Sequence, residues 1–301
     1  MRFPRKIAVV AHQRKTLGGG LDELRRRITD QGIGELFWYE VPKSRKAPKQ
    51  VRRALKRGAE LVIVWGGDGM VQRCVDVLAG TKATIGIIPA GTANLLATNL
   101  GIPKDLRAAV AIALGSHRRK LDVGRINGEH FAVMAGVGFD ARMIAAADGP
   151  LKDRFGRLAY IWTGAKSVRV KPFQAKIDVD GKKWFRGKAS CILVGNVGHL
   201  FGGVEAFENA EPDDGAFEIG VVTADGAVAW MRTIARAAID TAAASPYTET
   251  TSGRKIRIRL DRRVPYELDG GERSKTRALG IALERGAIRV CVPGEALSVA
   301  A

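Results

Sequence analysis

The sequence predicts a two-domain protein, with an N-terminal α/β domain and a C-terminal, mainly antiparallel β-sandwich domain. Up to residue 122, short apolar runs alternate with segments whose apolar residues recur every three or four positions, as in βαβ units. Beyond it, apolar runs flank two-residue turns, as in hairpins. The 301 residues, 46% of them hydrophobic, suffice for two cores. We therefore expect domains at 1–122 and 123–293, with a tail, 294–301, that can return to the first.

The first domain is predicted to alternate strands and helices along its whole length. Apolar runs predict strands at 6–11, 36–41, 61–65 and 84–88. Apolar residues at helical spacing predict helices at 21–28, 51–55, 71–78 and from 92 to about 100. The second of these helices is very basic and lies in the segment 43–56, which we expect to be a mobile connection.

The second domain is predicted to consist mainly of hairpins. Asn127-Gly128 and Asp180-Gly181 are dipeptides typical of two-residue hairpin turns. The strands predicted around these turns and after them are 123–126, 130–137, 173–179, 184–195, 217–222, 255–260, 265–268, 279–283 and 287–292. Two helices are predicted to interrupt them, at 157–168 and 226–243.

The charge balance predicts an anionic partner. The chain has 49 Lys and Arg against 31 Asp and Glu, which gives a formal net charge of +18. An excess of this size attracts nucleic acid, nucleotide phosphate or an acidic-lipid membrane surface. Nucleic acid is disfavoured because only 6% of residues are aromatic and no RRM, KH or helix-turn-helix signature is present.

The sequence also predicts a cytoplasmic protein. Its three cysteines are odd in number and far apart, as expected in a reducing compartment. The apolar run after the basic N-terminus is too short for a signal peptide. The uncharged segment 83–103 is interrupted by glycine, proline and asparagine, so we do not expect it to span a membrane.

Two glycine-containing loops follow predicted strands of the first domain. Glycines in Gly66-Gly67-Asp68-Gly69 would let backbone N–H groups approach phosphate oxygens, and the acid among them suits a magnesium ion. A tight turn without a ligand is the alternative interpretation. The second loop, Gly91-Thr92-Ala93-Asn94, also ends a strand, where ligands of open α/β sheets bind. Neither loop matches the P-loop or the dinucleotide-binding pattern.

Four segments in order carry a resemblance to a known family. They are GGDGM at 66–70, IIPAGTANLLATNLGIP at 87–103, LDVGRINGEHFAVMAGVGFDARM at 121–143 and EPDDGAFEIGVV at 211–222. Together they resemble the bacterial diacylglycerol kinase catalytic family, which is related to sphingosine and ceramide kinases. The resemblance implies a first domain similar to NAD kinase, ATP at the glycine loops, Mg²⁺, and phosphoryl transfer to a lipid hydroxyl.

The resemblance also implies roles for individual residues. The nucleotide-binding residues that it implies are Gly66, Gly67, Gly69, Met70, Gly91, Thr92 and Asn94, and Lys15 and Thr16 could also meet phosphates. Asp68 and Asp122 would belong to a magnesium–water network. Asp214, assisted by backbone carbonyls near Glu211 and Ala216, would hold a structural magnesium. Without the resemblance, Asp213-Asp214-Gly215 is better interpreted as a plain turn.

The proton acceptor implied by the family is a glutamate directly after an Asp-Gly pair. The sequence here is Asp269-Gly270-Gly271-Glu272, so Glu272 matches only if the turn contains one extra residue. A solvated turn acid is the alternative. Met70 replaces the family's usual threonine, and Leu95 replaces an acid, as in sphingosine-kinase-like relatives.

These observations predict an ATP- and Mg²⁺-dependent lipid kinase that acts on diacylglycerol at the inner face of the cytoplasmic membrane. Apolar residues that we expect to line the lipid cleft are Phe131, Val133, Met134, Val137 and Phe139. The alternatives are an NAD kinase, which also has a GGDG loop, and a regulator that binds nucleotide or phospholipid without catalysis. The sequence leaves open whether the chain forms a homodimer.

Overall fold

The computed structural model describes residues 6–32, 34–138, 171–199, 206–208, 210–224 and 247–294. The chain divides into two compact units. The first comprises Met1–Val123 with Glu284–Ala301, and the second comprises Gly124–Leu283. The chain therefore returns to the first unit at residue 284, ten residues earlier than the predicted tail. Of that tail, 295–301 lie outside the described residues, as do the predicted helices at 157–168 and 226–243.

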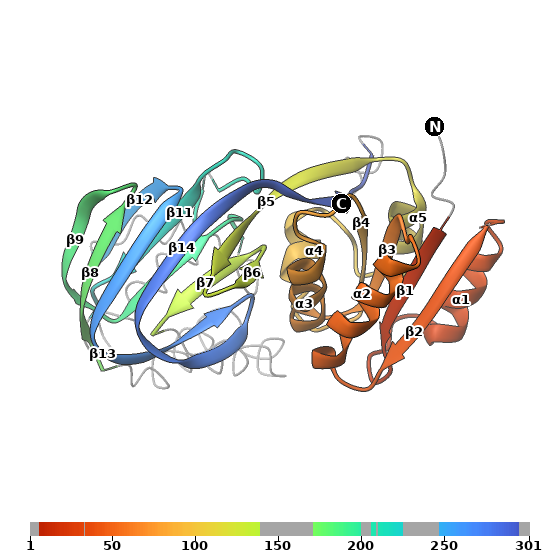
Figure 1. Ribbon diagram of the computed structural model, residues 1–301, viewed down its shortest axis with the longest axis horizontal. Coiled ribbons are helices and arrows are strands. Elements are labelled where there is room, and N and C mark those ends of the chain that lie inside the picture. Colours follow the sequence, from red (N-terminus) through yellow and green to blue (C-terminus); the bar gives the residue numbers. More distant parts are fainter. Residues whose placement is uncertain are drawn as a thin grey trace, which may run out of the picture. The chain divides into compact units, whose positions relative to one another are not determined.

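The first unit is a doubly wound α/β sheet (Figure 1). The strands β1 (Lys6–His12), β2 (Glu35–Val41), β3 (Leu61–Gly66) and β4 (Thr84–Pro89) are parallel, in the order β4-β3-β1-β2. The last residues of β14 (Gly271–Cys291) extend this sheet beside β4. All six residues of β3 are buried, as expected for a central strand covered on both faces.

In the described part of the first unit, six helices accompany this sheet. They are α1 (Gly20–Thr29), the 3₁₀-helix η1 (Ser44–Lys46), α2 (Ala47–Lys56), α3 (Asp68–Leu78), α4 (Leu95–Asn99) and α5 (Leu106–Leu114). The prediction of a mobile connection at 43–56 was wrong, because Ala47, Val51 and Ala54 bury one face of α2. Helix α5 was missed, although Asp105 before it is a sequence signal. Its carboxylate accepts the Ala108 N–H at 2.8 Å and caps the helix.

The second unit is built from antiparallel strands, which confirms the predicted β domain. Its strands are β5 (Arg118–Ile126, shared with the first unit), β6 (Glu129–Phe131), β7 (Met134–Val137), β8 (Phe173–Val179), β9 (Lys182–Ala189), β10 (Cys191–Gly195), β11 (Phe217–Val222), β12 (Thr248–Gly253), β13 (Lys255–Leu268) and β14. The main order is β12-β11-β10-β7-β13-β14. Strand β13 pairs with β8 in its first half and with β7 in its last three residues.

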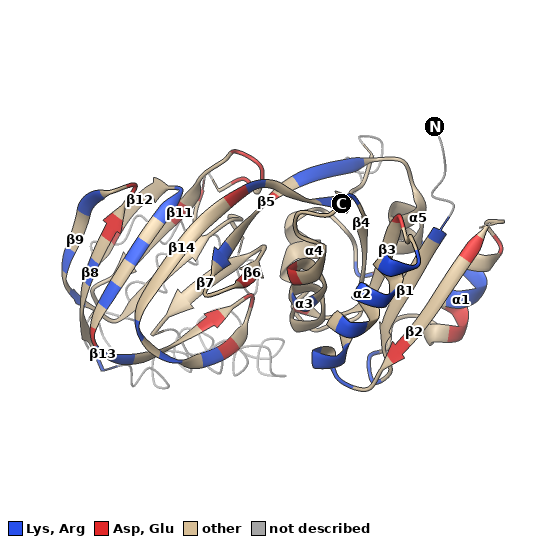
Figure 2. Ribbon diagram, viewed as in Figure 1, with Lys and Arg blue, Asp and Glu red and all other residues tan. Residues whose placement is uncertain are grey.

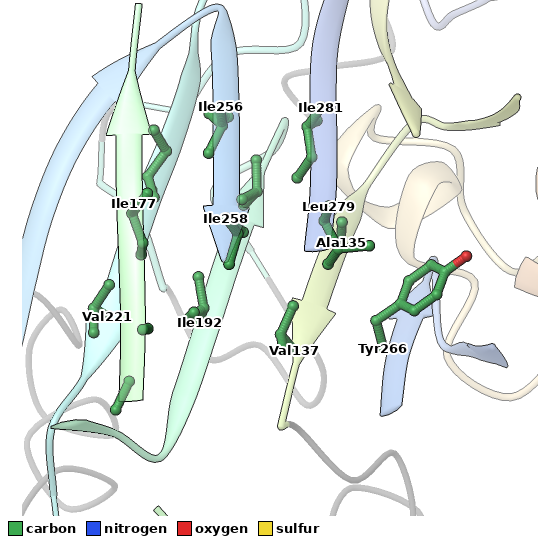
Figure 3. Close-up of a cluster of buried hydrophobic side chains, with 14 of the residues drawn as sticks. Ala135, Val137, Ile177, Ile192, Val221, Ile256, Ile258, Tyr266, Leu279 and Ile281 are labelled. Carbon is green, nitrogen blue, oxygen red and sulfur yellow. The ribbon is translucent and has the colours of Figure 1, made fainter. Parts of the chain in front are cut away.

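The core of this unit includes buried residues from both halves of β13 and from its neighbouring strands. The register of β13 against β14 shifts between Arg259 and Tyr266, which separates the half paired with β8 from the half paired with β7. Figure 3 shows side chains of this buried hydrophobic cluster, which come from several strands. Among them, Ile177 on β8 and Ile192 on β10 are fully buried.

Among the described residues of this unit, three hairpins turn through two residues with positive φ. They are Asn127-Gly128, Asp180-Gly181 and Asp269-Gly270, with φ angles of 50° and 87°, 49° and 83°, and 46° and 76°. Positive φ at both positions is the type I′ geometry, which matches the twist of paired strands. The first two turns were predicted from their dipeptides. The third closes the β13–β14 hairpin.

Candidate functional site

The two glycine loops lie side by side at the carboxyl ends of β3 and β4. The strands pair in parallel up to Gly66 and Pro89, so the loops start at the same level of the sheet. A Cβ on Gly91 would lie 2.4 Å from the Gly67 Cα, and a Cβ on Gly67 would lie 3.0 Å from the Gly91 Cα. This backbone contact requires glycine at both positions.

Asp68 joins the first loop to the second. Its Oδ2 accepts the Asn94 N–H at 2.9 Å, and its Oδ1 accepts the Leu95 N–H at 2.5 Å. These are N–H groups at the start of α4, which have no acceptor within the helix. Burial raises the pKa of the Asp68 carboxyl above its ordinary value of 3.8, although both hydrogen bonds oppose that shift. The carboxylate therefore holds the two loops together.

Asn94 closes the second loop on itself. It is buried and adopts a left-handed backbone with φ of 53°. Its Oδ1 accepts the Gly91 N–H at 2.8 Å, and its Nδ2 donates to the Gly91 carbonyl at 3.0 Å. The Asn94 side chain, predicted to contact the nucleotide, thus supports Gly91 from inside the loop.

Met70, another predicted nucleotide contact, also lies inside the protein. Its side chain is buried, and a Cβ on Gly66 would lie 2.6 Å from the Met70 Cβ. The Met70 N–H donates to the Gly67 carbonyl at 2.8 Å. The side chain of Met70 therefore packs against Gly66 and shapes the turn from the core side.

The open side of the first loop is at Gly69. No atom lies within 4 Å of the position that a Gly69 Cβ would take, whereas the Gly66 and Gly67 positions are filled. Gly69 belongs to the first turn of the 11-residue helix α3, where N–H groups have no acceptor within the helix and the helix dipole favours an anion. Thr92 in the second loop is exposed. This combination fits the phosphate groups of a nucleotide.

Lys15 and Thr16 lie in the loop after β1, next to the first glycine loop. The Trp65 indole Nε1 donates to the Lys15 carbonyl at 3.0 Å, directly before Gly66. The order of the strands reverses between β1 and β3, and such a switch point is where open α/β sheets bind ligands. The role of Trp65 was missed, because a buried strand residue gives no sequence signal for a contact fifty positions away.

His12, at the end of β1, has a pKa that its burial and the neighbouring loop both lower. Burial, followed by the charges of Lys15 and Arg14, lowers the pKa of His12 below its ordinary value of 6.5. The imidazole Nδ1 accepts the Arg14 N–H at 3.2 Å. Lys15 and Arg14 place positive charge in this loop at the switch point, which would favour an anionic ligand.

Asp122, predicted for the magnesium–water network, lies on β5 and is buried. Its Oδ1 accepts the Gly286 N–H at 2.6 Å, which links β5 to the returning strand β14. A second predicted metal residue, Asp214, is exposed and accepts the Ala216 N–H at 2.8 Å. The Glu211 carbonyl accepts the Asp214 N–H at 3.4 Å, as in a turn. Within the described ranges, no three His, Cys, Asp or Glu side chains form a metal-binding group.

Glu272, the predicted proton acceptor, follows the β13–β14 turn. This turn contains only Asp269 and Gly270, since Gly271 already pairs with Leu268, and Glu272 with Glu267. The extra residue that would bring Glu272 into the family's register is therefore absent. Glu272 is exposed and lies one position further along β14 than that register requires.

Asp269, which the sequence offered only as a turn residue, anchors this hairpin. It is buried, and its carboxylate accepts the backbone N–H groups of Ala132, Val133 and Met134, each at 2.9 Å. Three donors to one carboxylate hold the β6–β7 junction against the turn before Glu272. No dipeptide signal could reveal it, because the donors lie more than 130 positions away.

The predicted lipid-lining residues are core residues instead. Phe131 and Val137 belong to the buried cluster of the second unit, and the Phe131 ring stacks on Phe217 at 5.6 Å between centroids. Val133 and Met134 are also buried, and Phe139 lies outside the described residues. This part of the prediction is corrected. Among the residues that the structure describes, no helix is long and apolar enough to cross a membrane.

Comparisons with known proteins agree with this arrangement. The family described as diacylglycerol kinase catalytic domain matches residues 14–126, and the YegS C-terminal NAD kinase beta sandwich-like domain matches residues 132–294, more than half of the chain. A Bacillus subtilis (strain 168) protein named diacylglycerol kinase is 28% identical over 74% of this chain and 75% of its own length. A Pseudomonas aeruginosa protein named "Probable lipid kinase YegS-like" is 27% identical over 96% and 94%. For an Enterobacter sp. (strain 638) relative of the same name, 31% identical, the match spans only 62% of its length and 60% of this chain.

Solved structures confirm the fold. A diacylglycerol kinase from Bacillus anthracis str. Sterne superposes with a TM-score of 0.76 at 22% identity, over 99% of both chains. An NAD kinase from Archaeoglobus fulgidus, solved in complex with ATP, superposes with a TM-score of 0.57 at 11% identity, over 98% of this chain and 96% of its own. The two family models and the two solved structures therefore agree on a two-domain fold. The chain belongs to the bacterial diacylglycerol kinase catalytic-domain family of lipid kinases, which are phosphotransferases with an alcohol acceptor.

Proposed function

We propose that this lipid kinase transfers the γ-phosphoryl group of ATP to the hydroxyl of diacylglycerol and forms phosphatidic acid. The observation that carries the proposal is the pair of glycine loops held together by Asp68 at the switch point of the sheet. A triphosphate could bind at three features of these loops. They are the open side of the first loop at Gly69, the N-terminus of α3 and the exposed Thr92. The relatives named diacylglycerol kinase support the choice of lipid.

The residues of the first unit supply binding and charge neutralisation. N–H groups at Gly67 and Gly69 would donate to phosphate oxygens, the Thr92 hydroxyl would add a hydrogen bond, and Lys15 would add positive charge. A phosphoryl transfer with a loose transition state depends chiefly on such positioning and electrostatic stabilisation. These groups therefore account for most of the catalysis that we propose.

The proposal includes Mg²⁺ bound together with the nucleotide. When bound, the ion would neutralise phosphate charge, and kinases usually hold it by one or two carboxylates and the phosphates themselves. Asp68 fits this role because a carboxylate that accepts two N–H groups retains lone pairs for a water of the ion's shell. Asp122 would extend the network. Asp214, with carbonyls of Glu211 and Ala216, would hold a second, structural ion.

Glu272 is the proposed proton acceptor for the lipid hydroxyl. Its displaced register predicts a modest contribution, because a loose transfer requires little base assistance. Changing Glu272 to Gln should therefore lower kcat by less than the ~100-fold typical of a well-placed general base. The matched control is Glu249→Gln, another exposed strand glutamate. A loss of 10⁴-fold or more at Glu272, roughly the upper end for a base, would contradict the displaced register.

We further propose that the enzyme binds the cytoplasmic face of the membrane peripherally. The substrate is a membrane lipid, and the net charge of +18 favours an anionic lipid surface.

A transfer assay with labelled ATP tests the proposed function. Purified protein is incubated with Mg²⁺ and dispersed diacylglycerol, ceramide, sphingosine, monoacylglycerol or NAD. We expect label in phosphatidic acid and its loss by about 100-fold or more in Asp68→Ala, because the loops separate. The control is Asp22→Ala, an exposed acid on α1.

The same assay decides between the proposal and its alternatives. Phosphorylation of NAD alone would identify an NAD kinase, a possibility favoured only by the shared fold. No transfer to any acceptor, with nucleotide binding intact, would identify a non-catalytic regulator, which the replacement of the usual threonine by Met70 would then explain.

A further inference from the structure

Helix α2 and the turn before it carry a concentrated positive charge. Residues 43–57 include eight Lys and Arg and no Asp or Glu, out of a net charge of +18 for the chain. All eight side chains are exposed. Figure 2 shows the basic residues distributed along α2. A surface this basic needs an explanation that the nucleotide site does not supply.

One row of these cations has partners within the protein. Arg57 lies over the Phe37 ring at 3.8 Å from its centroid and pairs with Glu35 at 3.6 Å. Arg53, one turn earlier, lies over the Tyr39 ring at 5.7 Å. This row therefore packs α2 against β2 through stacking and an ion pair.

A second row, which we call the basic stripe, consists of Lys49, Arg52 and Lys56. These positions are separated by three and four residues, so they line one face of the helix. At 100° per residue this face is opposite the buried Val51 and Ala54. Across the described ranges, no ion pair joins the basic stripe to a carboxylate.

We infer that the basic stripe is the surface by which this kinase binds a bilayer of anionic phospholipid. Its three cations follow a straight line of about 10 Å, so all three can contact headgroups of one flat surface together. Lysine and arginine near such a surface each increase binding about fivefold. The inference rests on the proposed function, since a lipid substrate places the enzyme at a membrane.

The chemistry of the stripe favours lipid over RNA. Single-stranded nucleic acid is bound by cations interleaved with exposed aromatic rings. Here the nearby rings of Phe37 and Tyr39 are already covered by Arg57 and Arg53. The basic stripe therefore provides positive charge but, within the described residues, no free aromatic ring nearby on which a base could stack.

Vesicle partition of the full-length protein tests the inference. The probes are vesicles of phosphatidylcholine alone and of equimolar phosphatidylcholine and phosphatidylglycerol, without substrate. The test variant combines Lys49→Gln, Arg52→Gln and Lys56→Gln. The control combines Lys182→Gln, Lys183→Gln and Lys188→Gln, which removes the same charge from exposed positions of β9. Thermal melting checks that both variants fold.

We expect the stripe variant to bind the anionic vesicles about 100-fold more weakly than the unchanged protein, and the control less than about 5-fold more weakly. The difference should shrink in high salt, which screens exposed charges. Equal losses in the two variants, or none in the stripe variant, would overturn the inference. Single-stranded RNA is tested as a second probe. If the stripe variant loses binding to this RNA but retains binding to the vesicles, the inference is overturned as well.

A separate assay keeps this inference distinct from the proposed function. Transfer to diacylglycerol in neutral detergent micelles needs no anionic surface, so the stripe variant should retain its kcat there. If the unchanged protein shows no transfer in micelles, the proposed function fails, while vesicle partition still decides whether the stripe binds lipid. A fall in micellar kcat confined to the stripe variant would place α2 in catalysis and contradict a purely membrane-binding role.

Discussion

Single side chains decide how the loops around the candidate site are held. The Asp68 carboxylate accepts N–H groups at 2.9 and 2.5 Å from the other loop, and hydrogen bonds to a charged group contribute about 1.5–3 kcal/mol each. In the β domain, the Asp269 carboxylate plays the same structural part for the turn before Glu272. Both residues fix backbone geometry in addition to any contact with substrate.

The first prediction concerns His12 and Lys15. Because the charge of Lys15 is one cause of the lowered pKa of His12, Lys15→Gln should raise that pKa towards 6.5, and only in part, since burial is the larger cause. NMR titration of the imidazole measures it. Lys183→Gln, in the other unit, is the control. An unchanged pKa in Lys15→Gln would show that the ammonium group lies away from the switch point.

The sign of the stability effect follows from the same shift. With its pKa lowered in the folded state, His12 binds fewer protons there than in the unfolded chain. Its contribution to stability is therefore complete above about pH 6.5 and is lost as the pH falls through the lowered pKa. His12→Gln should remove this part of the acid sensitivity in urea unfolding measured at pH 5 and pH 7.

The second prediction concerns Asp269 and needs a matched turn residue. Asp269→Ala leaves three buried N–H groups without their acceptor, so we expect unfolding to become easier by about 3 kcal/mol or more. Asp180 occupies the same position in another type I′ turn, but it is exposed. Asp180→Ala should cost about 1 kcal/mol. Equal costs in urea denaturation would contradict the role assigned to Asp269.

At the scale of elements, the strand-to-helix junctions of the first unit define the site. Strands β1, β3 and β4 end at the same edge of the sheet, and α3 and α4 begin there. The contact between Gly67 and Gly91 depends on the absence of side chains, whereas Gly69 borders open space. The three glycines should therefore respond differently to the same substitution.

The third prediction compares Gly69→Ala with Gly91→Ala. In Gly69→Ala the new methyl group meets open space within a helix, so stability should rise by as much as about 1 kcal/mol while ATP binding weakens. In Gly91→Ala the methyl group would lie 2.4 Å from the Gly67 Cα, so stability should fall by about 2 kcal/mol or more. Melting curves with and without ATP measure both effects. Unchanged ATP binding in Gly69→Ala would place the phosphates elsewhere.

Much of this architecture could be predicted from sequence, because it depends on local patterns. Continuous apolar runs predicted the parallel strands, apolar residues at helical spacing predicted helices between them, and Asn-Gly and Asp-Gly dipeptides predicted two of the hairpins. The predicted mobility of 43–56 failed because charge was weighted above the apolar spacing of Ala47, Val51 and Ala54. Strand β12 was missed, because its sequence TETTSG has no apolar residue.

The candidate site was predictable in outline but not in its contacts. The glycine loops were identified from their sequence, and the structure brings Gly67 of one against Gly91 of the other. That Asn94 and Met70 face the protein interior follows from a left-handed residue and a packed helix face, which sequence spacing does not reveal. The lining residues Phe131 and Val137 failed because apolar density marks a core as readily as a lipid cleft.

At the scale of the whole molecule, the candidate functional features are distributed over the two units. The α/β unit carries the glycine loops, the positive switch point and the basic stripe, and the β unit carries the hairpin with Asp269 and Glu272. Both β5 and β14 contribute residues to both units, so the chain passes between them twice. If the proposed function is correct, the α/β unit must bind the nucleotide by itself through both loops.

Amide chemical shifts during a titration with ATP and Mg²⁺ test that requirement most directly. In ¹⁵N- and ²H-labelled protein, we predict that the amides of Gly67, Gly69 and Thr92 shift together and follow a single dissociation constant. Amides of the exposed Asp180 turn should not move. Shifts confined to residues away from β3 and β4, or different dissociation constants for the two loops, would contradict the claim that both loops bind one triphosphate.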